Sequence, residues 1–574
     1  MRHRLVAVDR SFRRLLRDAA KRQGGRGSRV AVAVVTDRDE SPVRRWVARA
    51  LPRASLTVVA PGDGAELHVR LAAAGPFGLI VDETEGGGAA KRARRLVFHL
   101  RPGGVLLLRR PRPGTPTVTR GRPRRREERH LADLAADVAR GASQLAPRNP
   151  VEPSDDRERF GQAVRELVLR DGHVALVARA SAYAEIREEQ CNRLLELRPD
   201  LGRVDLVLPP VTVRARGRIR QSETEFPREF PPAWDVPEMC LREYHDVVST
   251  PGQILTAGSL LLPDTYRHAA LRRPRSRYVR DLAPGFADAG TPPEFTAPVP
   301  ASGMRRLRGT YFYLDNEYRG HFGHLTTETV SRLWAWERAK ELDPEVKALV
   351  HVSRRGGVLP FELDYLAAGG IAPEDIVCTD DPVVVERLLA PTPMFSNPAY
   401  AHPGLVGLWG SIGDRLGARA EDRERPRHVF VSRRSSLRAV RNQGQVEELF
   451  SDLGFAVVFP EDHPPHEQVR LFREAEVVAG FRGSGLFNLF FAGEGKRTLL
   501  VGSEAYTAHN EILAAGLLGH DTAIAWCVPE ATRLDDGRWA PRSFQQPFTV
   551  DLDREGRFIR DVVGEWTGAV GRGR

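Results

Sequence analysis

Cysteine is scarce in this chain, with four residues among 574. No two of them form the C-x-x-C pair used by zinc ribbons and many redox sites; they are Cys191, Cys240, Cys378 and Cys527. We therefore expect neither a zinc site nor a disulfide framework.

Long apolar runs are also lacking. No stretch of about 18 apolar residues occurs, so the sequence predicts no membrane-spanning segment. The N-terminal sequence MRHRLVAVDRSFRRLL is basic but has neither the apolar core nor the small-residue cleavage site of a signal peptide, and we expect a cytoplasmic protein. At 574 residues the chain is too long for one core and should form three or four domains.

The net charge of +11 raises the question of nucleic-acid binding. Arginine far outnumbers lysine, and alanine, glycine and proline are abundant, which is typical of GC-rich coding. The densest basic run, RGRPRRREER from Arg120 to Arg129, lies among prolines. We interpret it as a solvated linker, with contact to anionic lipid or nucleic acid as the alternative, and expect no nucleic-acid partner.

Residues 1–112 alternate strand and helix patterns, which favours a parallel, doubly wound sheet. The strand patterns cover residues 30–36, 56–60, 77–82 and 105–108. The order FGLIVDE, helix, HLRPGGVLLL resembles a class I methyltransferase, but that family's glycine-rich cofactor loop is missing after the first strand. We predict a degenerate, non-catalytic Rossmann-like domain, followed by a basic linker and helix over 113–150. A methyltransferase dependent on S-adenosylmethionine is the alternative.

The stretch YFYLDNEYRGHFGHLTTETVSRLWAW, residues 311–336, combines a short strand, a polar loop and a helix. His321 lies in the loop, and His324 stands four residues before Glu328, so these two share one helix face. A histidine at such a junction suits a general base. Helix capping and ordinary surface histidines are the alternative interpretation.

Three loops follow strand patterns in the last third of the chain. The strand HVFVS leads into Arg433, the strand VVAGF leads into the turn Arg482-Gly483-Ser484-Gly485, and the strand RTLLVG leads into Glu504. In an open parallel sheet, ligands bind beyond the carboxyl ends of the strands. Arginines and a helix N-terminus hold a diphosphate there, and an acid accepts hydrogen bonds from ribose hydroxyls. The three loops together indicate a nucleoside diphosphate as the ligand more strongly than any one loop does.

Residues 300–525 resemble glycosyltransferase family 61. That family has segments of the form N-F-G-H-W-x-x-E-x-x-x-R-L, then S-R with further basic residues and N-E, then G-x-H-G-[SA]-G-L-[TF]-N. This chain has GHFGHLTTETVSRL, VFVSRRSSLRAVRNQ and GFRGSGLFN in the same order. Arg482 departs from the family's histidine, and Gln443 departs from its acid after Asn442. Residues 150–300 are interpreted as the family's weakly patterned N-terminal portion.

The resemblance implies a GT-B fold, with an N-terminal half over 151–395 and a nucleotide-sugar half over 396–574. It implies an inverting, metal-independent hexosyl or pentosyl transfer from a nucleotide sugar to a glycan or other hydroxyl acceptor, in bacterial surface polysaccharide synthesis. No cofactor is expected besides this donor, and no Asp-x-Asp motif ends a strand of the candidate site.

Site roles follow from the motifs and the resemblance together. His324 is the predicted base, with His321 as the less favoured choice and Glu328 as the orienting acid. The predicted donor-binding residues are Ser432, Arg433, Arg434, Arg438, Asn442, Arg482, Gly483, Ser484, Gly485, Asn488 and Glu504. Because of the two departures, a nucleotide-sugar-binding protein without turnover is the competing hypothesis.

Overall fold

The structure is a computed structural model of the whole chain. It describes residues 10–23, 29–84, 88–109, 132–141, 156–171, 173–179, 183–224, 228–266, 303–352, 356–434, 438–535, 537–540 and 542–568. The basic run from Arg120 to Arg129 lies outside these residues. None of the described helices is long and apolar enough to cross a membrane.

The chain divides into two compact units. The first contains residues 1–204, 243–308 and 382–387, and the second contains residues 205–242, 309–381 and 388–574. Four strands each contribute residues to both units: β8 (Gly202–Leu208), β12 (Met239–Thr250), β15 (Arg305–Tyr313) and β18 (Val383–Pro391). Each unit is described below by itself.

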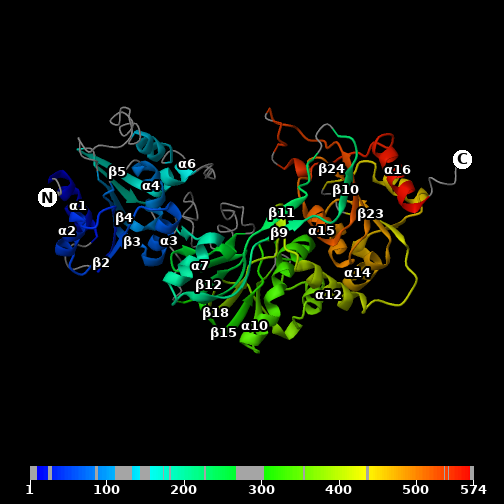
Figure 1. Cartoon of the computed structure of the whole chain (residues 1–574), viewed down its shortest axis with the longest axis horizontal. Coiled ribbons are helices and arrows are strands. Elements are labelled where there is room, and N and C mark those ends of the chain that lie inside the picture. The colour runs from blue at the N-terminus through cyan, green and yellow to red at the C-terminus, as the bar shows by residue number, and fades with distance from the viewer. Residues whose placement is uncertain are drawn as a thin grey trace. The chain divides into compact units, whose positions relative to one another are not determined.

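The first unit contains a six-stranded sheet in the order β2-β1-β3-β4-β6-β5, called here the first sheet (Figure 1). Its first four strands are parallel, and β6 is antiparallel to both neighbours. The elements of this region are α1 (Arg10–Arg22), β1 (Ala31–Val35), α2 (Pro42–Ala50), β2 (Ser55–Val59), α3 (Gly64–Ala74), β3 (Phe77–Asp82), α4 (Ala89–Leu96), η2 (Val97–His99), β4 (Leu100–Leu108), α6 (Asp156–Ala163), β5 (Val164–Arg170) and β6 (His173–Ala178).

Alternation along the strands gives the first sheet two apolar faces. Val32 and Val34 face a cluster that includes Phe12 of α1 and Val43 of α2. Ala33 and Val35 face the opposite cluster, which contains residues of α3, α4 and α6. Helices therefore cover both faces, and the predicted α/β class is confirmed.

The rest of the first unit combines mostly short strands with helices. These elements are β7 (Ala184–Glu185), α7 (Glu188–Leu197), β13 (Ile254–Ala257), β14 (Leu260–Leu261) and η3 (Pro263–Thr265), with β8 (Gly202–Leu208) continuing into the second unit. Residues 132–141, part of the predicted linker region, are helical.

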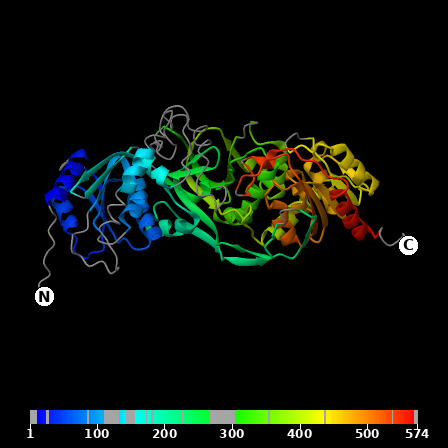
Figure 2. The ribbon, with the colours of Figure 1, turned by 90° about the horizontal axis from the view of Figure 1, so that it is seen from above.

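The second unit contains a six-stranded, wholly parallel sheet in the order β10-β25-β24-β23-β21-β22, called here the second sheet. One face carries α13 and α16, and the other carries α14 and α15. Helix α16, drawn in red, lies against this sheet in both views (Figures 1 and 2). The elements are β10 (Arg218–Gln221), β21 (His428–Val431), α13 (Gln443–Asp452), β22 (Ala456–Val458), η8 (Pro460–Asp462), α14 (Pro465–Glu474), β23 (Val477–Phe481), η9 (Ser484–Phe491), β24 (Arg497–Ser503), α15 (Asn510–Leu518), β25 (Asp521–Cys527), η10 (Ser543–Gln545) and α16 (Glu555–Thr567).

The remainder of the second unit packs helices around β15, β16 and β17, which are parallel. The elements are β9 (Val211–Arg214), β11 (Ala233–Val236), α9 (Phe322–His324), η5 (Leu325–Thr329), η6 (Val330–Ala335), α10 (Trp336–Leu342), β16 (Lys347–His351), α11 (Pro360–Ala368), η7 (Pro373–Asp375), β17 (Ile376–Thr379), β19 (Phe395–Ser396), β20 (Tyr400–Ala401) and α12 (Leu405–Gly417).

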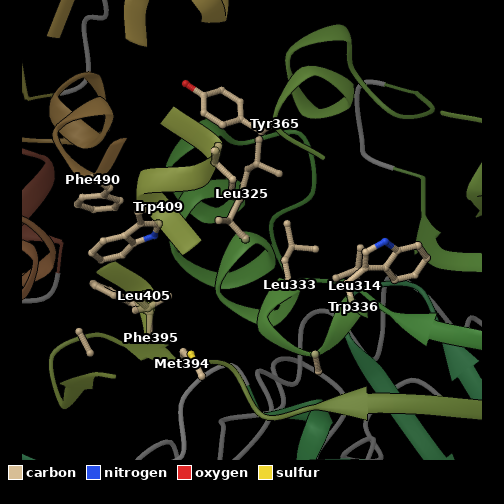
Figure 3. Packing of buried hydrophobic residues seen from close by; sticks show 14 of the residues in the cluster. Leu314, Leu325, Leu333, Trp336, Tyr365, Met394, Phe395, Leu405, Trp409 and Phe490 are labelled. Carbon is tan, nitrogen blue, oxygen red and sulfur yellow. The ribbon is translucent and has the colours of Figure 1, made fainter. Parts of the chain in front are cut away.

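One apolar cluster joins these helices to η9 (Figure 3). Trp409 of α12 stacks on Phe490 of η9, with ring centroids 4.9 Å apart. The same cluster contains Leu325 and Leu333, which belong to residues 321–336, called here the histidine segment. Burial of this apolar surface fixes η9, which follows the glycine turn, against the segment that carries His324.

Two expected helices are not regular α-helices. After His324 the chain forms a π-helical turn, Leu325–Thr329, and then a 3₁₀ helix, Val330–Ala335. After the glycine turn it forms the 3₁₀ helix Ser484–Phe491. Short π-helical turns occur frequently at functional sites.

Candidate functional site

The carboxyl edge of the second sheet gathers the loops that the sequence singled out. Strands β21, β23 and β24 are parallel and lie close together in the sheet order, so Arg433, Arg482 and Glu504 follow them at one edge. Residues 435–437 of the first loop lie outside the described residues.

Arg438 lies against the glycine turn. It has a φ of 57°, its N–H donates to the Gln545 carbonyl at 3.2 Å, and a Cβ on Gly483 would lie 2.8 Å from its Nη2. Gly483 itself has a φ of 141°, which side chains disfavour. The backbone thus favours glycine at 483, and the Arg438 guanidinium lies directly beside it.

Arg482 is 2% exposed and is held by several contacts. Its Nη2 donates to the Ala508 carbonyl at 2.9 Å and lies 3.3 Å from Glu511 Oε2. Glu511 Oε1 also accepts the Gly483 N–H at 3.0 Å, so that amide of the turn already has a carboxylate partner. A Cβ on Gly502 would come within 3 Å of the Arg482 side chain, so this glycine makes room for it.

Arginines and aromatic rings alternate through this edge. We call the five side chains the cation–π ladder: Arg438, Tyr506, Arg482, Trp526 and Arg228. Tyr506 lies 4.5 Å from the Arg438 guanidinium carbon and 5.0 Å from that of Arg482, measured to the ring centroid. Trp526 lies 5.1 Å from Arg482 and 4.4 Å from Arg228. Each ring thus separates two cations at a distance that favours cation–π attraction.

The guanidinium groups at this edge exceed the carboxylates that face them. Burial, followed by the charge of Arg438, lowers the pKa of Arg433 to about 10. Buried Nε atoms of Arg433, Arg438 and Arg482, and Nη1 of Arg482, have no hydrogen-bond partner among the described residues. Buried N–H groups of cations are costly to leave without an acceptor, and a bound anion supplies one. The edge is therefore chemically suited to a polyanion.

Other predicted donor residues have partners away from the ladder. Arg434 is exposed and pairs with Asp462, with Nη2 and Oδ2 2.5 Å apart. Asn442 exchanges hydrogen bonds with the backbone of Val550, and buried Asn488 accepts from the Tyr365 hydroxyl at 2.5 Å. These contacts fix the fold around the site.

Ser432 and Gln443 form a separate polar group behind Arg433. Ser432 Oγ donates to Glu447 Oε1 at 2.5 Å. Gln443 Nε2 donates to that same carboxylate oxygen at 2.8 Å and to the Arg433 carbonyl at 3.0 Å. An amide donor at 443 thus suits a site that already holds the Glu447 carboxylate.

Glu504 also has contacts that sequence reasoning did not foresee. Its carboxylate accepts from the Thr224 hydroxyl and lies 3.7 Å from Arg533 Nη2. The predicted contact to a ribose stays a prediction, in competition with these partners.

His324 and Glu328 form the pair expected from their spacing. His324 Nδ1 lies 2.7 Å from Glu328 Oε1, and the imidazole stacks on Tyr318 with centroids 4.4 Å apart. A proton on Nδ1, held by the carboxylate, leaves the lone pair on Nε2 and makes that nitrogen basic. His321 instead caps the helix, because its Nδ1 accepts the Gly323 N–H at 3.1 Å.

The histidine segment and the glycine turn meet at Gly323. A Cβ on Gly323 would lie 3.0 Å from Ser484 Cβ, and 3.2 Å from Phe487. Gly485 lies in ordinary contact with Val431, at the end of β21. The structure thus brings the segment of His321 and His324 beside the turn that Arg438 and Arg482 flank.

The residues that sequence reasoning missed are Tyr506, Glu511, Trp526 and Arg228. Each of these residues lies on or next to a different helix or strand, and only the order of the strands in the sheet brings them together. Among the described residues, no group of three or more His, Cys, Asp or Glu side chains is placed to hold a metal ion.

Comparison with known proteins bears on this part of the chain. Residues 322–499 match the model of the Glycosyltransferase 61 family. The Glycosyltransferase 61 match contains His324 and Glu328 but begins just after His321; it also contains the first basic loop and the glycine turn, and ends before Glu504, Tyr506 and Trp526. It is narrower than the predicted resemblance, whose extension toward residue 150 lies outside it. None of the curated proteins matches the chain.

Among solved structures, the N-terminal part has a weak similarity to the MycE methyltransferase of the mycinamycin biosynthetic pathway. Crystal forms with magnesium and SAH, and one that also holds mycinamycin VI, are 16–18% identical with TM-scores of 0.21–0.23. The similarity covers 29% of this chain and 45–48% of that one, so the chain spans about half the length of this structure. A likeness this slight assigns no activity.

Proposed function

We propose that the protein is a glycosyltransferase that moves a sugar from a nucleoside-diphosphate donor to a hydroxyl acceptor. The observation that carries the proposal is the excess of buried guanidinium groups at the carboxyl edge of the second sheet, beside His324 and its carboxylate partner. The match to Glycosyltransferase 61 over residues 322–499 supports the same reaction class.

The donor diphosphate binds between Arg433, Arg438 and the glycine turn in this proposal. Guanidinium groups bind phosphate oxygens with two parallel hydrogen bonds, and the buried site strengthens each of these bonds. An anion also offsets the burial and the charge of Arg438, which together lower the pKa of Arg433. Arg482, which Glu511 holds, supports the turn and adds charge behind it.

His324 acts as general base. Its Nε2 takes the proton of the acceptor hydroxyl, whose oxygen then forms a bond to the anomeric carbon. The bond from that carbon to the donor phosphate breaks, and the diphosphate leaves with the electron pair toward the arginines. One displacement of this kind inverts the anomeric centre. Glu328 stabilises the imidazolium that forms.

The finer parts of the proposal rest on the family. They are a GT-B arrangement, an acceptor that is a glycan, and a role in bacterial surface polysaccharide synthesis by a cytoplasmic enzyme. Because arginines neutralise the leaving diphosphate, the proposed reaction requires no divalent cation.

The test is release of free nucleoside diphosphate from UDP-, GDP- and TDP-sugars in the presence of hydroxyl acceptors. We expect His324→Ala to lower kcat by about 10²- to 10⁴-fold, the usual contribution of a general base. Arg433→Ala should mainly weaken donor binding. The control is His463→Ala. His463 directly follows η8, in the same predicted half of the chain as Arg433. Wild-type turnover in both site variants would exclude the assignment.

Binding of a nucleotide sugar without turnover is the second candidate. The observation that favours it is that Glu511 already occupies the Gly483 N–H, which reduces the donors available to a leaving group. Thermal stabilisation by nucleotide sugars with no release of diphosphate, across the acceptors tested, would select this candidate.

A further inference from the structure

A strand from far upstream completes the second sheet at the edge next to β25. β10 pairs with it in parallel from Arg218–Asp521 to Gln221–Ile524. The chain beyond β10 stays attached, because Ser222 Oγ accepts the Trp526 N–H at 2.9 Å and Gln221 Oε1 accepts the Trp526 indole N–H at 2.9 Å. Residues 218–224 and 228–230, called here the upstream segment, thus reach the carboxyl edge beside the ladder.

The upstream segment holds the loop that carries Tyr506. Arg228 donates from Nη1 to the Tyr506 carbonyl at 2.9 Å and from Nη2 to the Glu504 carbonyl. Thr224 donates to the Glu504 carboxylate. A planar guanidinium satisfies two carbonyls at once, which a single ammonium cannot do with the same geometry.

Arg228 remains a charged group in an unfavourable place. Burial, followed by the charge of Arg482, lowers its pKa to about 10. A lysine-sized or neutral side chain would avoid part of this cost. Arg228 lies at the end of the cation–π ladder. An anion bound there compensates the free-energy cost of burying the Arg228 charge.

We propose that Arg228 is a positioning residue of the diphosphate site. It fixes Tyr506 between Arg438 and Arg482, and it adds to the positive charge of the site that the anion occupies. This inference rests on the proposed function, and extends the site to a segment that lies outside residues 322–499. The ligand class is a diphosphate, either inorganic or carried by a nucleoside.

The test uses the full chain and isothermal titration with inorganic pyrophosphate and with UDP, together with donor KM and kcat. We expect Arg228→Gln to weaken both ligands about tenfold or more and to raise the donor KM more than it lowers kcat. Arg228→Lys keeps the positive charge but not the planar, two-pronged guanidinium. We expect its affinity for both ligands to fall about threefold. Thermal unfolding of each variant shows that it is folded.

The matched control is Arg220→Gln. Arg220 lies on β10, in the same upstream segment as Arg228, but it pairs with Asp521 and Glu565 and lies over Trp566. We expect it to keep diphosphate affinity within about twofold, because its contacts lie outside the ladder.

Four results would overturn the inference. Unchanged affinity in Arg228→Gln removes any role, and equal losses in Arg228→Gln and Arg220→Gln reduce the role to anchoring of the strand. Full affinity in Arg228→Lys reduces it to charge. If wild-type protein binds neither pyrophosphate nor any nucleoside diphosphate, the proposed function fails as well, whereas in the other cases it stands.

Discussion

Helices cover both faces of each six-stranded sheet in this protein, but the two carboxyl edges differ in their balance of charge. At the end of β3 in the first sheet, acids are matched by arginines: Asp82 accepts from Arg92 Nε at 2.8 Å and from Thr84, and Glu83 lies 3.7 Å from Arg109. At the second sheet, Arg433, Arg438, Arg482 and Arg228 face fewer carboxylates.

The difference teaches how to tell a structural edge from a ligand edge. Paired buried charges neutralise each other without any need for a ligand, whereas an excess of one sign is tolerated when a ligand supplies the other sign. Parallel strands and glycine turns are common to many α/β proteins and do not distinguish the two sheets.

The largest expected effect breaks the comparison directly. Arg438→Ala should weaken UDP binding by about 1.5–3 kcal/mol, or roughly 10- to 150-fold, because it removes a charged donor beside Gly483. Arg434→Ala, whose exposed side chain pairs with Asp462, should change it little. Arg92→Ala in the first sheet should leave UDP binding unchanged, by titration calorimetry. A loss in Arg92→Ala equal to that in Arg438→Ala would contradict the contrast.

A smaller effect tests the cost of the unpaired charge. Arg433→Gln should stabilise the unliganded protein by about 1–3 kcal/mol, since it removes a cation whose pKa burial lowers, while it weakens UDP binding. Thermal unfolding with and without UDP measures both. Arg441→Gln is the control, because Arg441 is exposed and paired with Glu530. A destabilised unliganded Arg433→Gln protein would show that the charge is already compensated.

The smallest effect uses His509 as a reporter of the ladder. Burial, then the charges of Arg482 and Arg228, lower the pKa of His509 to about 4. Since the unfolded state binds a proton more readily, stability should fall as the pH drops from about 6.5 to 4. Arg228→Gln should raise the His509 pKa, measured by NMR titration of the imidazole. An unchanged pKa would place Arg228 farther from His509 than the structure does.

Local sequence pattern predicted much of this fold. Phe77–Asp82 and Val477–Phe481 are strands with the bounds expected from their apolar runs. Arg433, Arg438 and Arg482 could be assigned to one edge because strand ends of a parallel sheet lie together.

The missing parts are those that depend on contacts between distant residues. Glu511 lies on a helix and accepts a hydrogen bond from the Gly483 N–H. The periodicity of the helix does not reveal this partner. Arg228 follows a four-residue strand in a proline-containing region, and its relation to Trp526 arises only from the pairing of β10 with β25. The irregular turns after His324 and Gly483 follow from packing in the shared apolar cluster, which overrides helix propensity.

The pairing of β10 with β25 also bears on biosynthesis. Ser222 and Trp526 bond to each other although they stand 304 positions apart in the sequence. At roughly 5–20 residues per second, translation separates their appearance by about 15–60 seconds. During that interval the upstream strand has no sheet to join, and a fragment that begins after it would leave β25 as an open edge, prone to pairing with other chains. Completion of the second sheet is therefore a late, long-range step of folding, and fragments cut within the upstream segment should aggregate more than the full chain.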